Sequence, residues 1–448
     1  MDIFIKILQL VLSLSILVLF HEFGHFLFAK LFKTRVEKFY LFFNPWFSLF
    51  KFKKGDTEYG IGWLPLGGYV KIAGMIDESM DTEQLKQPAK SWEFRSKPAW
   101  QRLLIMMGGV LVNVVLAFFI YIMVLYTWGE TYLPVQNVKS GVMCDVVFKD
   151  MGMENGDVIV ALGDIPADDF YEIVPDMLLN NPKTIKVKRG DEMVVLDIPA
   201  DFVSQLLVMS SKSFTMKSLI SPRQLLDSMS VAGFGDYSVA YDAGLREKDK
   251  IVAVNGQYFQ YYDEFTGALD TLKGQHVVTT VLRGKDTLEY AFNLGNDGKF
   301  GIYFATTERL EFATREYSFL AAIPAGINKG VETIGSYLKQ LKLVFSHKSE
   351  AYRSVGGMMS IGNIFPGVWN WQIFWELTAF ISIMLAIVNI LPIPALDGGH
   401  VLFLLYEVIT RRKPGEKFME YAQVAGMFLL LALFVLANVN DIIRLFGS

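Results

Sequence analysis

An apolar run from about Ile7 to Phe32 contains the polar stretch His21-Glu22-Phe23-Gly24-His25. A run of this length predicts a membrane-spanning helix, in which two imidazoles and a carboxylate are costly unless they bind something. Residues four apart share one face of a helix, so His21 and His25 can hold one metal ion, and Glu22 can reach a water beside it. A purely structural role would leave polar groups unpaired in the membrane, so we expect a metal site here.

A third metal ligand must come from elsewhere in the chain, because a catalytic zinc usually has three protein ligands and one open position. The best candidate is Asp397, which lies in a stretch that interrupts a second apolar run beginning near Ile373. Two prolines and two glycines in this stretch break helical hydrogen bonding, which is tolerated at membrane depth where the backbone lines a site. Two alternatives stay open: Asp397 could cap a helix at the membrane surface, or His400 could be the ligand, although we expect His400 at the water interface.

These motifs together resemble those of the site-2 protease family, the intramembrane zinc metalloproteases. The resemblance rests on HEFGH in the first span, on Leu396-Asp-Gly-Gly399 in a late one, and on its lead-in Asn389-x-x-Pro-x-Pro394. Length and domain content resemble the RseP-type branch, the bacterial regulator of sigma-E protease, over essentially the whole chain. The resemblance implies that zinc (Zn²⁺) is the cofactor. It implies the following roles: His21, His25 and Asp397 as zinc ligands, Glu22 as catalytic base, and Asn389 as a substrate-binding residue.

The composition agrees with a membrane protein that also carries soluble mass. The chain has 448 residues, of which 52% are hydrophobic, and its formal net charge is −4. A charge so close to zero gives no electrostatic basis for binding nucleic acid. The single cysteine, Cys144, excludes an intrachain disulfide, and we expect it to be packed rather than reactive. The first apolar run also lacks the basic cluster and the cleavage site of a signal peptide.

Four membrane spans are expected, each close to the ~20 apolar residues that a bilayer requires. The loops between spans one and two and between spans three and four are rich in lysine and arginine, so both are expected in the cytoplasm. The termini and the long middle segment then lie outside it. HEFGH and Asp397 fall in the cytoplasmic half at similar depth, which supports one shared metal site. The expected spans are Ile5–Leu31, Leu103–Tyr126, Ile373–Ile409 with a break at Pro392–Pro394, and Tyr421–Ala437.

The middle segment contains an internal repeat. Residues 152–161 match residues 244–253, and each copy is followed by a glycine turn and later by an apolar hairpin around Arg-Gly, at 185–198 and 277–294. The pattern resembles tandem PDZ domains, which bind an extended peptide at a sheet edge. Neither copy has a clear carboxylate-binding loop, and Val231–Gly235 matches such a loop only loosely. The two domains could therefore bind no peptide and act only as bulk.

Two further segments are predicted around the membrane region. In residues 36–71, apolar and aromatic side chains either alternate with polar ones or stand in unbroken runs. This segment resembles the membrane-reentrant β-hairpin region of the family, and a small cytoplasmic sheet is the alternative. Residues 79–100 are polar and mixed in charge and predict a cytoplasmic connector. Residues 311–348 have helical spacing of apolar side chains with lysines between them. This segment predicts an amphipathic helix leading to the membrane, or one packed against the second PDZ-like domain.

The predicted fold is a polytopic α-helical membrane protein with four transmembrane helices, a membrane-associated β-hairpin region and two extracytoplasmic PDZ-like α+β domains. Residues 1–128 form the N-terminal membrane region with the HExxH helix. The other predicted parts are PDZ-like domains at 130–200 and 222–306, an amphipathic connector at 311–350, and a C-terminal membrane region at 373–448. The expected location is the bacterial cytoplasmic (inner) membrane, with the lipid bilayer as a partner and the PDZ-like domains in the periplasm.

The expected function is regulated intramembrane proteolysis by a zinc metalloendopeptidase. The resemblance implies single-pass membrane substrates already trimmed by a site-1 protease, such as anti-sigma factors of a stress response, or remnant signal peptides. The PDZ-like pair would filter substrates by size. A substrate helix must unwind before cleavage, because its carbonyls are hydrogen-bonded. The residues expected to hold the unwound strand are Gly67, Gly68, Asn389, Pro392 and Pro394.

Two other classes of protein remain open at this stage. The chain could be a membrane scaffold whose PDZ-like pair binds peptides beside a structural metal site, but such a site needs four protein ligands and we find three. It could be a metal transporter, which should carry further ionisable residues along a path through its spans. Glu376 is the one other acidic residue well inside a span.

Overall fold

The computed structural model describes residues 2–75, 88–203, 205, 219–235, 237–306, 310–344 and 356–446. The chain forms two compact units. The helical unit comprises Met1–Glu130 and the chain from Glu316 onward, and the β-rich unit is chiefly Thr131–Arg315. Residues 79–87 of the connector expected at 79–100, and the end of the one expected at 311–350, lie outside the described residues.

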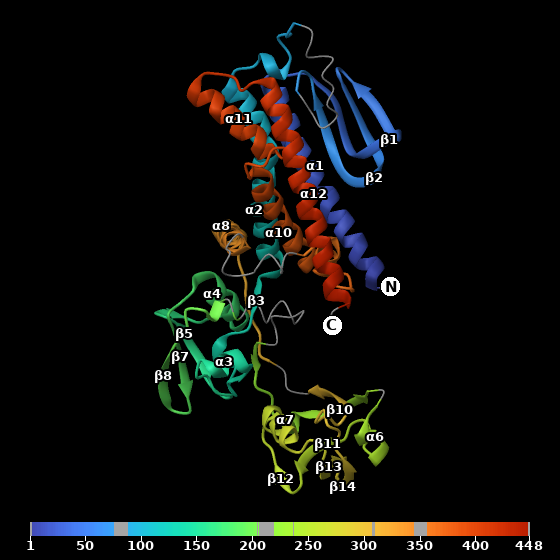
Figure 1. The fold of residues 1–448 in the computed structure, drawn as a ribbon, viewed down its shortest axis with the longest axis vertical. Helices are drawn as coiled ribbons and strands as arrows, with labels where there is room; N and C mark the ends of the chain where they lie inside the picture. Colours follow the sequence, from blue (N-terminus) through green and yellow to red (C-terminus); the bar gives the residue numbers. More distant parts are fainter. Residues whose placement is uncertain are drawn as a thin grey trace. The chain divides into compact units, whose positions relative to one another are not determined.

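Four helices of the helical unit are long and apolar enough to cross a membrane (Figure 1). The shortest has 20 residues, which at 1.5 Å per residue spans a hydrocarbon core of ~30 Å. Four candidate spans are thus present, as expected, and the third ends at Ile390, before the prolines that predicted a break in it. The helix that resumes after the break is separate and short, α11 (Asp397–Thr410). The four long helices are α1 (Asp2–Leu31), α2 (Ala99–Trp128), α10 (Trp371–Ile390) and α12 (Glu416–Phe446).

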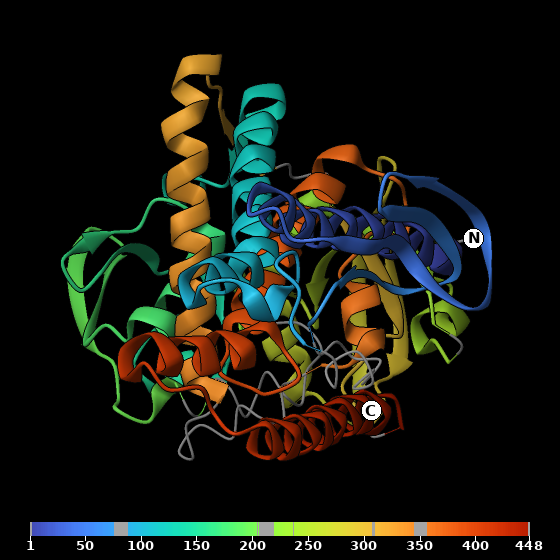
Figure 2. The same cartoon turned by 90° about the horizontal axis from the view of Figure 1, so that it is seen from above.

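A further helix, α8 (Phe319–Val344), packs on α2 within the helical unit (Figure 2). Its glycines allow a close approach: a Cβ on Gly326 would lie 2.6 Å from the main-chain nitrogen of Ile122, and one on Gly330 would lie 2.3 Å from the ring of Phe118. Apolar residues farther along α8 join a core shared by α2 and α10. The amphipathic pattern of this segment therefore serves helix packing in the helical unit. A short helix, α9 (Met358–Asn363), follows in the described part of the chain.

Strands β1 (Val36–Lys54) and β2 (Thr57–Ile72) form the expected hairpin beside α1. The pair is curled, because Lys38–Leu41 of β1 lies between two parts of β2, Glu58–Ile61 and Gly68–Lys71. Large aromatic side chains are exposed near its bend, and Trp46 is 90% exposed. Exposed aromatic residues of this kind are typical of a surface that contacts a bilayer interface.

The β-rich unit contains two copies of one arrangement, as the sequence repeat predicts. Each copy has a four-stranded sheet. Each copy also has its own apolar core. The first copy has β5 (Val158–Leu162), β6 (Ile165–Pro166), α4 (Ile173–Asn180), β7 (Thr184–Arg189) and β8 (Glu192–Asp197). The second has β11 (Lys250–Val254), β12 (Gln257–Tyr258), α7 (Tyr262–Thr271), β13 (His276–Arg283) and β14 (Asp286–Asn293). The strands of the sheet lie in the order β6-β5-β7-β8 in the first copy and β12-β11-β13-β14 in the second.

Shorter strands complete the β-rich unit in three pairs. One of them joins the segment that enters the unit to the segment that leaves it, so the two ends of the unit lie side by side. The pairs are β3 (Glu130–Tyr132) with β16 (Ala313–Arg315), β4 (Val142–Cys144) with β9 (Ile220–Pro222), and β10 (Met229–Phe234) with β15 (Ile302–Thr306). The short helices are α3 (Val146–Asp150) and α6 (Val239–Ala243).

An ion pair with a buried aspartate explains why the repeat combines a glycine, an aspartate and a later arginine. In the first copy, Nε and Nη2 of Arg189 donate to the two carboxylate oxygens of Asp157 at 2.8 Å each. Nη2 of Arg189 also donates to the carbonyl of Gly152 at 2.9 Å. The Asp157 side chain is fully buried. The bidentate geometry lets a carboxylate lose water without losing hydrogen bonds.

The second copy repeats this contact. Nε and Nη2 of Arg283 donate to Asp249 at 2.7 and 2.8 Å, and the main-chain N–H of Arg246 adds a bond of 2.8 Å. Burial opposes ionisation of Asp249, but the Arg283 hydrogen bonds and the Arg246 N–H outweigh it and hold the pKa of this carboxyl below its usual value. A lowered pKa stabilises the fold above the unfolded pKa of ~4, and this contribution is lost as the pH falls through the folded pKa.

We therefore predict that Asp249→Asn loosens the second copy at neutral pH and leaves the first copy unchanged. The amide cannot accept two charged hydrogen bonds, so amide hydrogen exchange in residues 250–293 of the full chain should speed up about tenfold or more. Mass spectrometry of exchange resolves the two copies within one sample. In acid, wild type and variant should converge after correction for intrinsic rates. Asp286→Asn, at the exposed start of β14, is the matched control, and equal effects of both variants would contradict the prediction.

Candidate metal centre

The first two candidate ligands lie where α1 crosses α2. Gly24, between His21 and His25 in the sequence, meets Gly108 so closely that a Cβ on Gly24 would lie 2.2 Å from the Gly108 carbonyl oxygen. No side chain can occupy this crossing, so the backbones touch. The contact presses the histidine face of α1 directly against α2.

His25 is oriented by a main-chain carbonyl. Its Nδ1 lies 2.9 Å from the carbonyl oxygen of Ile105 on α2, and the side chain is only 10% exposed. A carbonyl can only accept, so Nδ1 must carry the hydrogen and Nε2 keeps its lone pair. Metal-binding histidines usually have such a partner, which sets the tautomer and the ring orientation.

Asp397, the candidate third ligand, is the first residue of α11 and follows the broken stretch after α10. Two glycines after it allow the loop to fold back on the new helix. A Cβ on Gly398 would lie 2.1 Å from the Leu391 carbonyl oxygen, and one on Gly399 would lie 2.6 Å from Cα of Pro394. The Asp-Gly-Gly motif thus combines a carboxylate with the two residues that leave room for its loop.

The three candidate ligands converge on one point. His21 Nε2 lies 3.2 Å from His25 Nε2, and Oδ2 of Asp397 lies 3.1 and 3.3 Å from these two nitrogens. Zinc bonds of ~2.0–2.1 Å in tetrahedral geometry place neighbouring ligand atoms ~3.3 Å apart, so the separations fit zinc. Oδ2 of Asp397 is buried and accepts no hydrogen bond from the described residues. Converging lone pairs of this kind are stable only around a cation.

Two residues of α2 that sequence reasoning missed also line this centre. A Cβ on Gly109 would lie 2.5 Å from Cε1 of His21 and 2.6 Å from Nε2 of His25, so only glycine leaves room for the two rings. Asn113, one turn further, is fully buried, and its Nδ2 lies 3.4 Å from Nδ1 of His21. A buried asparagine in an apolar span was the available signal, because amides in membrane helices are rare without a partner.

Glu22, the expected base, lies on α1 beside the hairpin strand β2. A Cβ on Gly68 would lie 3.4 Å from Cγ of Glu22 and 2.9 Å from Cγ1 of Val18. Gly68 is therefore at a point of close approach between β2 and the helix that carries HEFGH. Its neighbour Gly67 has φ +143°, a conformation that L side chains rarely adopt. The structure thus places Gly68, one of the two glycines predicted to hold substrate, against the helix that carries HEFGH.

The other expected substrate residues lie around the break after α10. Asn389 is the penultimate residue of α10, and Pro392 and Pro394 lie in the loop that leads to Asp397. The loop contains Ala395 at φ +82°, a strained conformation for a residue with a side chain. His400 lies one turn into α11 and is not in the cluster that the described residues form.

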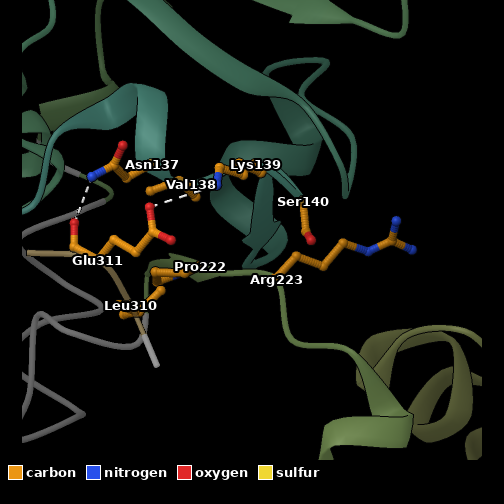
Figure 3. Close-up of a pocket in the computed structure, with 8 residues that line it drawn as sticks. All are labelled: Asn137, Val138, Lys139, Ser140, Pro222, Arg223, Leu310 and Glu311. Carbon is orange, nitrogen blue, oxygen red and sulfur yellow. Dashed lines mark hydrogen bonds and ion pairs between the residues drawn. The ribbon is translucent and has the colours of Figure 1, made fainter. Parts of the chain in front are cut away.

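A cavity in the β-rich unit has no comparable set of ligands. It measures about 130 Å³, and Lys139 pairs across it with Glu311 at 3.5 Å, both side chains being exposed (Figure 3). Cys144 is buried in the same unit, where burial raises the pKa of its thiol to about 12, so it is unreactive as expected. The residues around the cavity are Asn137, Val138, Lys139, Ser140, Pro222, Arg223, Leu310 and Glu311. Chemistry is therefore expected at the metal centre.

Comparison with known proteins agrees with this geometry. The family model described as peptidase family M50 matches residues 9–433. Relatives named "Putative zinc metalloprotease" match along nearly their whole length. A relative from Thermotoga maritima is 25% identical, with 98% of this chain and 99% of the relative covered. One from Campylobacter jejuni is 28% identical over 99% and 95%, and one from Vibrio cholerae is 26% identical over 99% and 100%.

The family match extends over both the HEFGH helix and the Asp-Gly-Gly loop, which supply the three converging ligand atoms. The full-length relatives have the same extent as this chain, so the similarity is not confined to one motif. The chain belongs to peptidase family M50, the site-2 protease family, and is a zinc metalloprotease of the RseP type.

Proposed function

We propose that this enzyme cleaves peptide bonds within the membrane-spanning segments of single-pass proteins. The observation that carries the proposal is the convergence of three ligand atoms, 3.1–3.3 Å apart, two of which come from α1, a helix long and apolar enough to span a membrane. A site at this place is reached by a substrate that is itself in the bilayer. Three protein ligands leave a fourth position open, which is typical of catalytic rather than structural zinc.

His21, His25 and Asp397 would hold the zinc. Bound zinc supplies a Lewis acid that activates water at neutral pH and polarises a carbonyl. Glu22 follows His21 directly on α1, and its Cγ lies close to Gly68 of β2. From there its carboxylate takes a proton from the attacking water and returns it to the leaving amine.

The substrate strand would add to the hairpin. A transmembrane helix hides its carbonyls in hydrogen bonds, so it must unwind and find other partners for its backbone. The Gly68 end of β2 offers an edge beside Glu22, and strand addition satisfies the backbone of an extended peptide. Asn389, Pro392 and Pro394 lie in the stretch that carries Asp397, where an amide and a broken helix could hold the other side of the strand.

The charge pattern supports the bacterial inner membrane with the metal centre toward the cytoplasm. The segments joining α1 to α2 and α11 to α12 carry most of the lysines and arginines that flank the spans. The β-rich unit then lies on the outer face. A unit on that face cannot reach the scissile bond, so its effect would be on access to the site.

The two copies in the β-rich unit are of PDZ-like topology and would act as a size filter. An ion-pair network stiffens the connection between them: Arg223, on the linking segment, donates to Asp263 at 2.8 and 3.1 Å, and Asn155 of the first copy donates to the same carboxylate at 2.8 Å. A stiff pair would collide with a long external substrate tail. Substrates trimmed by a site-1 protease, such as anti-sigma factors, or remnant signal peptides would pass.

The zinc ligands predict the metal content of variants. His21→Ala and Asp397→Asn should each lose most of the bound zinc, because removing one of three ligands leaves an incomplete site. Elemental analysis of purified full-length protein measures this loss. His400→Ala is the matched control and should keep its zinc. Full zinc in both ligand variants would overturn the ligand set.

If Glu22 is the catalytic base, a variant without its carboxylate should bind metal but not cleave substrate. Glu22→Gln should keep its zinc and lose cleavage of a membrane substrate by at least ~100-fold, the scale of a lost general base. Glu376→Gln, the other acidic residue well inside a span, is the control and should cleave normally. Cleavage by Glu22→Gln near the wild-type rate would show that another group moves the proton.

The filter predicts a gain of activity on deletion. β3 and β16 pair with each other, so the ends of the β-rich unit are close enough for a short flexible linker to replace residues 131–315. The deletion should permit cleavage of untrimmed single-pass substrates and preserve cleavage of trimmed ones, measured side by side in membranes. Loss of trimmed-substrate cleavage in a deleted protein that still inserts and binds zinc would instead make this unit a docking site.

A further inference from the structure

The three metal ligands do not by themselves explain why α2 has a buried asparagine, Asn113, beside them. It is 0% exposed within an apolar span, and its Nδ2 faces Nδ1 of His21 at 3.4 Å. Its Oδ1 is buried and has no hydrogen-bond partner among the described residues. A buried amide oxygen without a partner is costly, and more so in a membrane span than in a soluble core.

The chemistry of a metal-bound imidazole supplies a reason for this amide. A histidine that gives its Nε2 lone pair to a metal carries its hydrogen on Nδ1, and that hydrogen needs an acceptor. For His25 the acceptor is the Ile105 carbonyl at 2.9 Å. For His21 the group facing Nδ1 is the Asn113 amide, whose Nδ2 lies nearest the ring.

We propose that Asn113 is a positioning residue for the metal centre: with metal bound, its Oδ1 accepts the hydrogen on Nδ1 of His21. A half-turn about the terminal side-chain bond exchanges the oxygen and nitrogen of an amide, which have nearly the same shape. The exchange gives Oδ1 the partner it lacks and selects the tautomer of His21 that leaves Nε2 free. The inference rests on the ligand set proposed above.

The surroundings hold the amide at this place. Ser382 of α10 donates to the main-chain carbonyl of Asn113 at 2.8 Å, which ties this turn of α2 to α10. One turn earlier, Gly109 lies directly against the His21 ring, so the ring cannot easily move away from Asn113. One ligand is thus oriented by a main-chain carbonyl and the other by a side chain that substitution can test.

Two substitutions separate this role from simple filling of space. Asn113→Leu keeps the volume and removes the acceptor, so zinc affinity should fall about 10–100-fold, the usual effect of losing such a partner. Asn113→Asp presents an acceptor oxygen without any exchange and should bind zinc at least as tightly as wild type. Affinity is measured on the full chain by competition with a zinc chelator. Thr378→Val, which removes a buried hydroxyl that bonds to Ser13, is the matched control and should leave affinity unchanged.

Three results would overturn the inference: unchanged affinity in Asn113→Leu, equal losses in Asn113→Leu and Asn113→Asp, or a loss in Asn113→Asp alone. Should the leucine variant fail to fold, the aspartate variant still decides, because a structural need for the NH₂ group would weaken its zinc binding. His21→Ala in the same assay keeps the two proposals apart. If His21→Ala loses zinc while the Asn113 variants bind it as wild type does, only the positioning role of Asn113 is rejected, and the ligand set stands.

Discussion

The close crossing of α1 and α2 is the contact on which the metal centre depends. Gly24 and Gly108 let the two backbones touch, and Gly109 then leaves room for two imidazole rings between the helices. In lipid, helices gain little from burying apolar side chains against one another, so close backbone contact and polar partners must hold them together. Here the crossing supplies both the backbone contact and a polar partner, because it brings the Ile105 carbonyl within 2.9 Å of His25. The site and the helix pair are therefore one structural feature, and a larger residue at the crossing would disturb both.

Sequence reasoning predicted the parts of this site that carry their own local signal. HEFGH has the spacing of one helix face, and Asp397 stands in a stretch whose prolines break a span, so both are visible without a structure. The hairpins around Arg189 and Arg283 were visible for the same reason, because turn residues and alternation are local. Gly109 and Asn113 were missed because their role depends on the packing of α1 against α2. The spacing of residues within α2 does not show which helix packs against it. The helix at 319–344 shows the same limit: its apolar face was evident, but α2 as its partner was not.

The two units reach stability by different physical means. The β-rich unit has two apolar cores, and beside each it buries one aspartate carboxylate that is paired with a partly exposed arginine. A buried carboxylate of this kind is tolerated because each of its oxygens is hydrogen-bonded. The helical unit buries polar groups of another sort, hydroxyls and amides that bond between helices, as Thr378 does with Ser13. Buried charges among the described residues of this unit have partners, as Arg102 has in Glu407, or lie where a metal can neutralise them.

The break after α10 supplies the third ligand of the metal centre. A continuous helix there would have satisfied every backbone group and offered neither a ligand nor a partner for an incoming strand. The prolines end α10, Ala395 takes a strained conformation, and Asp397 starts the next helix at the level of the histidine pair. Strain of this kind persists only where neighbouring contacts enforce it, and here the glycines after Asp397 allow those contacts to close. The same irregular backbone lies beside the ligands, so one interruption of a span accounts for the third ligand and for the main-chain groups that the proposed substrate strand would need.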